Sequence, residues 1–161
     1  MKRIARLASL GLLLCAAACS DRDEAAEAGS DAPDVPDLGE IMTATQIRHG
    51  KLFFAGESEN WDLAAYELKE LGEGFEAAAR FHPEHEGRPV AELLPVYMNP
   101  PLESLGAAIE ARDRNAFRAG YDRLTASCNA CHEAAQVGFN RIARPTSPPF
   151  TNQDFAPSKK P

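Results

Sequence analysis

The residues Cys128-Asn129-Ala130-Cys131-His132 place two thiols three positions apart, with a histidine directly after the second. This C-x-x-C-H spacing is typical of c-type haem attachment, in which the thiols add to the porphyrin vinyl groups and the histidine ligates the iron. On a helix, residues 128 and 131 share a face and residue 132 lies one turn beyond 128, so all three address one edge of a flat ring. One such motif predicts one covalent haem c.

Two other chemistries also use closely spaced cysteines. A thioredoxin-like C-x-x-C pair usually opens a helix after a strand, whereas Cys128 and Cys131 lie deep in a predicted helical segment. A zinc site needs about four ligands, and the remaining histidines, His49, His82 and His85, do not form a paired pattern. A lipoprotein with a redox-active or metal-binding C-x-x-C remains the alternative without haem.

An apolar cofactor must be buried, so amphipathic helices are needed to place the motif in the interior of the protein. Residues 38–56 have apolar side chains at helical spacing, preceded by Asp37 and Glu40 as a capping pair. A second segment begins after Asn60 and repeats apolar residues at bundle spacing as far as Ala78. Both segments therefore predict helices that bury one face.

The second half of the chain predicts two more helices. Residues 90–101, VAELLPVYMNPP, are expected to be irregular because prolines interrupt them, and Pro101 suits the first turn of a helix that reaches Ile109. The last helix opens at Asp113 and has the C-x-x-C-H motif on its apolar seam. Four amphipathic segments with almost no strand signal predict an all-α, antiparallel four-helix bundle.

Both ends of the chain differ from the predicted bundle domain at residues 38–137. Residues 1–18 combine a cationic start with a short apolar run that ends in small residues, which is typical of an export signal. Cys19 then stands where a bacterial lipoprotein is acylated. The alternative to lipidation at Cys19 is a secreted protein that is cut near Ala18. Residues 19–37 are acidic and broken by prolines, and they predict a disordered tether. The proline-rich residues 138–161 are expected to pack on the bundle in part.

The charge of the chain limits the kinds of molecule that it can bind. The chain has 17 basic and 24 acidic residues, a formal net charge of −7, and no basic stripe that indicates nucleic acid. Removal of residues 1–18 brings the net charge to about −10, which disfavours electrostatic binding to anionic lipid. We expect a periplasmic protein that meets the membrane only through an N-terminal lipid.

The run DRNAFRAGYDRLTASCNACHEA, with its single motif near the end of the last helix of a predicted bundle, resembles cytochrome c′ and its low-spin relative cytochrome c556. The resemblance covers roughly residues 38–136. It implies thioethers at Cys128 and Cys131, His132 as the proximal iron ligand, and a homodimer through the first two helices. Gln136 stands where the family often has a basic residue, and the proline-rich tail is also unlike a typical cytochrome c′. These departures indicate a divergent member.

The second axial position of the iron decides which function the resemblance implies. In the c556 type a methionine near the start of the first helix ligates the iron, and Met42 has that place here. Ligation would give a six-coordinate carrier of single electrons between periplasmic redox proteins. A vacant distal face would instead imply a protein that binds gases such as NO or CO. The sequence offers no distal acid–base pair of the kind that would indicate an enzyme.

Other side chains near the predicted haem have two interpretations. His49, on the stripe of Met42, is a rival distal ligand or a satisfied core residue, and Met98 in the proline-bounded loop is a third candidate. Arg48 and Lys51 either pair with haem propionates or belong to a solvated helix face. His82 and His85 flank a proline in a charged loop and are expected to be exposed to solvent.

Overall fold

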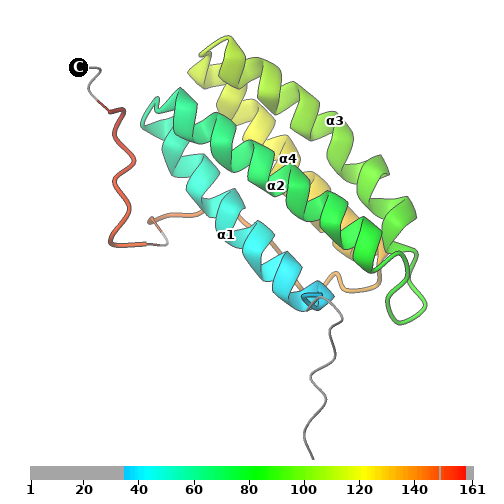
Figure 1. The fold of residues 1–161 in the computed structure, drawn as a ribbon. Helices are drawn as coiled ribbons and strands as arrows, with labels where there is room; N and C mark the ends of the chain where they lie inside the picture. The colour runs from blue at the N-terminus through cyan, green and yellow to red at the C-terminus, as the bar shows by residue number, and fades with distance from the viewer. Residues whose placement is uncertain (1–34, 149, 159–161) are drawn as a thin grey trace, which may run out of the picture. The chain divides into compact units, whose positions relative to one another are not determined.

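Four helices form the bundle (Figure 1): α1 (Leu38–Glu57), α2 (Trp61–Phe81), α3 (Val90–Glu110) and α4 (Arg114–Ala134). This computed structural model describes residues 35–148 and 150–158. The predictions for residues 1–18, for Cys19 and for most of the acidic segment lie outside that part of the chain. Helix α1 packs on α2, α2 on α3 and α3 on α4, whereas α1 and α4 pack less closely than these three pairs. The prediction of an all-α four-helix bundle is confirmed.

Side-chain caps determine where three of the helices begin. The Asp37 carboxylate accepts from the Glu40 backbone N–H at 2.8 Å, and the Glu40 carboxylate accepts from the Asp37 N–H at 3.1 Å. Asn60 caps α2 by accepting from the Leu63 N–H at 3.2 Å. Asp113 accepts from two backbone N–H groups in the first turn of α4, at 2.9 and 3.0 Å. These contacts satisfy N–H groups that have no partner inside a helix, and they confirm the three predicted caps.

Helix α3 contradicts the prediction that residues 90–101 are irregular. It begins at Val90 and runs through Pro95, Pro100 and Pro101 without a break. Each internal proline lacks the N–H that would bond to the carbonyl four residues earlier. The helix forms nevertheless, because buried side chains recur at helical spacing through the prolines: Val90, Leu94, Met98, Pro101, Leu105, Ala108 and Ile109. Burial of that face outweighs the low helix propensity of proline.

Two glycines allow close helix approach in the bundle. A Cβ atom on Gly56 of α1 would lie 2.1 Å from the Phe117 ring of α4, and one on Gly74 would lie 2.6 Å from a Thr45 methyl group. By contrast, a Cβ on Gly72 would meet its nearest side chain, Leu102, at 4.0 Å. Close packing at a glycine of α2 is therefore found at Gly74 and not at Gly72.

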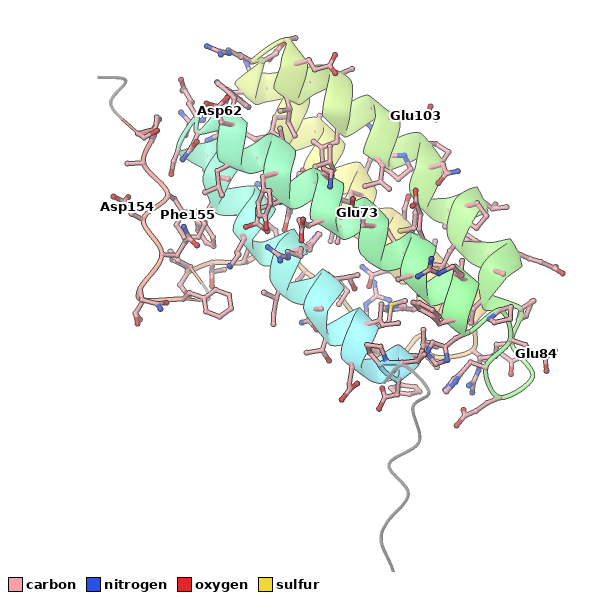
Figure 2. The ribbon with its side chains drawn as sticks, in the orientation of Figure 1. Asp62, Glu73, Glu84, Glu103, Asp154 and Phe155 are labelled. Carbon is pink, nitrogen blue, oxygen red and sulfur yellow. The ribbon has the colours of Figure 1, made fainter. Side chains whose placement is uncertain are left out.

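The C-terminal segment turns back along the bundle after α4. The Asn129 side chain bonds to both backbone groups of Ile142, at 2.8 and 2.9 Å. Further along, Phe155 is buried with its ring centroid 5.7 Å from that of Phe54 in α1 (Figure 2), and the Asn60 side chain donates to the Ala156 carbonyl at 3.0 Å. Part of this proline-rich segment thus packs on the bundle. None of the helices in the described residues is long and apolar enough to span a membrane.

The two glycine environments predict opposite effects of the same substitution. Gly56→Ala forces a methyl group into the fully buried Phe117 ring and should lower the free energy of unfolding by about 1–3 kcal/mol. Gly72→Ala, in the same bundle, should raise it by about 0.5–1 kcal/mol because alanine is the better helix former. Urea unfolding followed by circular dichroism measures both. Equal effects of the two substitutions would contradict the packing of α1 against α4.

Candidate haem site

A cavity of about 440 Å³ lies at the end of the bundle where α1 begins and α4 ends. This volume is within the range of about 300–1,000 Å³ that is usual for small-molecule and cofactor sites. All four helices contribute to its wall, together with the α2–α3 loop and the segment after α4. Most of the wall is apolar and includes Leu38, Met42, Leu71, Phe75, Val90, Leu94, Met98, Val137 and Ile142. An apolar planar ligand is the kind of occupant that such a wall favours.

The residues of the C-x-x-C-H motif line this cavity from the last turns of α4. Cys131 is buried, and Cys128 and His132 are half-buried. Both cysteines are free thiols. Burial raises the pKa of Cys128 to about 12 and also raises the pKa of Cys131. Reactive cysteines of thioredoxin-like pairs usually have a lowered pKa, and burial shifts these two thiols in the opposite direction.

The imidazole of His132 has a backbone partner on one side. Its Nδ1 atom lies 2.6 Å from the carbonyl oxygen of Asn140. Because a carbonyl can only accept, Nδ1 must carry the hydrogen, and the lone pair of the neutral ring is then on Nε2. Histidines that ligate metals usually donate their other N–H in this way. Sequence reasoning missed the Asn140 contact, because a backbone carbonyl leaves no signal in the residue type.

Two methionines line the cavity, one from each side of the bundle. Met42 on α1 is half-buried, and its sulfur lies 3.9 Å from the Thr45 hydroxyl. Met98 is 1% exposed and lies inside α3, not in a loop as predicted. The prediction was wrong because the apolar face of α3 continues through its prolines. Met42 and Met98 are therefore the two thioethers available to a ligand in this cavity.

His49 also lines the cavity, but hydrogen bonds engage both of its ring nitrogens. The Thr125 hydroxyl donates to the Tyr121 carbonyl at 2.9 Å, so His49 Nε2 must donate to Thr125 Oγ1, 2.9 Å away. Nδ1 then accepts from the Tyr121 hydroxyl, which lies 2.9 Å away and shares its hydrogen with the His49 carbonyl at 3.0 Å. The ring is 4% exposed, and burial lowers its pKa to about 4. Iron ligation would break one of these bonds, which favours the interpretation of His49 as a satisfied core residue.

A short turn between α2 and α3 brings charged side chains to the cavity. His85 and Arg88 exchange two backbone hydrogen bonds of 3.0 Å, with Glu86 and Gly87 at positive φ between them. Arg88 donates from Nη1 to the Glu86 carboxylate at 2.5 Å. Its Nε is buried and has no hydrogen-bond partner within the described structure. Because Arg88 lines the cavity, it is a cation that lies close to any carboxylate on the occupant.

The other cations considered for haem propionates lie elsewhere. Arg48 donates to Glu67 and Glu70 at 3.1 Å each, and the Lys51 ammonium lies 4.9 Å from the centroid of the Phe150 ring. Neither residue lines the cavity. Of the loop histidines, His85 is exposed, as predicted, although it borders the cavity. His82 is only half-buried, and its Nε2 lies 2.8 Å from the Pro36 carbonyl.

No protein-family model, curated protein or solved structure matches the chain. Within residues 35–148 and 150–158, no group of three or more His, Cys, Asp or Glu side chains is arranged to hold a bare metal ion. The resemblance to cytochrome c′ therefore stays a prediction from the sequence. What the structure adds is the geometry of the cavity.

The buried His49 ring predicts a specific pH dependence of stability. Its folded pKa of about 4 lies below the unfolded value of about 6.5, so the unfolded chain binds the extra proton first. The contribution of the neutral His49 ring to the free energy of unfolding should be fully present above pH 6.5. It should fall by up to about 3 kcal/mol as the pH drops to 4. Urea unfolding at successive pH values measures the slope. In His49→Gln this slope should be absent, and a slope equal to that of the unsubstituted protein would contradict the assignment.

Proposed function

We propose that this protein is a periplasmic c-type cytochrome that holds one covalent haem in the cavity and carries single electrons between redox proteins. The observation that carries the proposal is that Cys128, Cys131 and His132 line one apolar cavity together with Met42. When bound, haem supplies an iron that accepts and releases one electron reversibly. Lipid attachment at Cys19 belongs to the same proposal and would keep the protein at the membrane.

The two cysteines would hold the ring. Each thiol would add to one vinyl group, with the thiol hydrogen passing to the other vinyl carbon, so that attachment would consume no oxidant. Cys128 and Cys131 both line the cavity, where the ring would lie. His132 would ligate through Nε2, the nitrogen that the Asn140 contact leaves free.

The remaining wall would orient the ring and exclude water. Arg88 lines the cavity and would pair with a propionate, and Glu86, which now accepts from the same guanidinium, would share it. Leu94, Phe75 and Val90 would supply apolar surface to the ring. Met42, on the first helix as in the c556 type, is the proposed distal ligand, and a thioether there favours electron transfer over gas binding.

Covalent attachment is tested by co-expression with haem-attachment machinery. The mature protein should stain for haem after denaturation and should have the mass of the polypeptide plus one haem. The Cys128→Ala/Cys131→Ala variant should lose the stain completely, because no thioether can form. Cys19→Ser is the matched control and should keep it. Purified protein at the bare polypeptide mass, with both motif thiols free, would refute the proposal.

The distal ligand is tested by replacing the two methionines of the cavity separately. Met42→Ala should convert a low-spin oxidised spectrum to high spin, abolish the near-infrared sulfur-to-iron band and allow rapid CO binding after reduction. Met98→Ala should leave all three properties unchanged. If Met98→Ala has these effects instead, Met98 is the ligand. If the unsubstituted protein is already high-spin and binds CO rapidly, gas binding replaces electron transfer as the function.

A further inference from the structure

The segment that follows α4 runs back along that helix. Asn140 reaches His132, Arg141 pairs with Glu133, Ile142 pairs with Asn129, and Arg144 pairs with Asp122. From Asn140 to Arg144 the contacts thus move from the last turn of α4 toward its start. We name residues 140–144 the strap.

The strap is held on α4 independently of its contact with His132. Asn129 Oδ1 accepts from the Ile142 N–H at 2.8 Å, while Asn129 Nδ2 donates to the Ile142 carbonyl at 2.9 Å. The Arg144 guanidinium donates to the Asp122 carboxylate from Nε at 3.1 Å and from Nη2 at 2.5 Å. Exposed ion pairs contribute little to stability, whereas the Asn129 pair is partly buried and fixes the strap backbone at both its donor and its acceptor.

The turn that leads into the strap also has a fixed backbone. The Val137 N–H donates to the His132 carbonyl at 2.8 Å, and the Asn140 N–H donates to the Val137 carbonyl at 2.9 Å. Gln136 has φ of +59°, which ends the helical path directly after α4. The Asn140 carbonyl is thus placed opposite His132 by backbone bonds on one side and by the Asn129 pair on the other.

We propose that the strap is a positioning element for the proximal histidine, which holds the His132 hydrogen on Nδ1 and thereby lowers the reduction potential of the protein. This inference rests on the proposed haem function. It gives a role to Asn129, which occupies one of the two motif positions where haem attachment requires no particular side chain. It also gives a role to the C-terminal segment, which the resemblance to cytochrome c′ does not explain.

The direction of the effect follows from the hydrogen bond. Donation from Nδ1–H to a carbonyl increases electron density on Nε2 and makes it a stronger base. A more electron-donating ligand stabilises oxidised iron more than reduced iron, so the potential falls. Loss of the bond should reverse this. Partners of this kind typically change metal affinity by about 10–100-fold.

Asn129→Ala tests the inference in the haem-loaded, full-length mature protein. It removes both bonds to Ile142, and with them the restraint that holds the Asn140 carbonyl opposite His132 from the strap side, without altering a cysteine or an iron ligand. The potential should rise by about 59 mV, which is a tenfold change in the ratio of oxidised to reduced protein for one electron. The iron–histidine stretching band of the reduced protein, measured by resonance Raman in the Met42→Ala background, should move to lower frequency.

Phe155→Ala is the matched control for general loosening of the C-terminal segment. It removes a buried aromatic contact with Phe54 and leaves the strap intact, so stability should fall while the potential and the stretching band stay unchanged. A chain that ends at Gly138 removes the Asn140 carbonyl altogether and should match or exceed Asn129→Ala. Haem-loaded Asn129→Ala and truncated proteins with unchanged potential and band would overturn the inference, as would an equal change in Phe155→Ala. Absence of haem from every variant and from the unsubstituted protein would overturn the proposed function itself.

Discussion

The weak contact between α1 and α4 is the constraint on which the site depends. The bundle is closed where α1 packs on α2, α2 on α3 and α3 on α4, while α1 and α4 pack less closely than these three pairs. The side of the bundle between α1 and α4 contains three features. Gly56 and Phe117 bring the two helices together at one end, the bonds of His49 join them in the middle, and the cavity lies at the other end. A bundle with four equally tight sides would have no room for a planar cofactor beside the last turns of α4.

The bonds of His49 define the inner limit of this cavity. The Tyr121 and Thr125 hydroxyls and the imidazole each contribute one hydrogen, and each hydrogen has an acceptor. A buried polar network in which every member is satisfied adds rigidity, whereas an unpaired member would be costly. Burial also raises the pKa of Tyr121, which keeps that hydroxyl a donor. The network therefore separates the glycine contact from the cavity and keeps the His49 imidazole from competing for a metal there.

What the sequence could predict was local in origin. The caps at Asp37, Asn60 and Asp113 and the apolar spacing of the helices depend on residues within one turn of one another, and so does the placement of the motif on one helix face. The predictions that failed, and the contacts that were missed, depend on tertiary structure. Val90 and the residues after it are helical because their apolar face packs on other helices, and that gain does not appear in the helix propensity of proline. The carbonyl of Asn140 and the buried Nε of Arg88 depend on tertiary placement and on backbone atoms, for which residue type carries no signal.

If haem is bound as proposed, the proximal and distal sides would act on its potential in opposite directions. His132 lies in the last turn of α4, where the helix dipole places partial negative charge and favours a cation. Its Nδ1–H bond to Asn140 would favour the oxidised iron as well. A thioether from Met42 would favour the reduced iron, and so would the positive charge of Arg88 beside the cavity. Because these contributions come from α4 with its strap, from α1 and from the α2–α3 turn respectively, substitution in one element can tune the potential while the motif that attaches the cofactor stays unchanged.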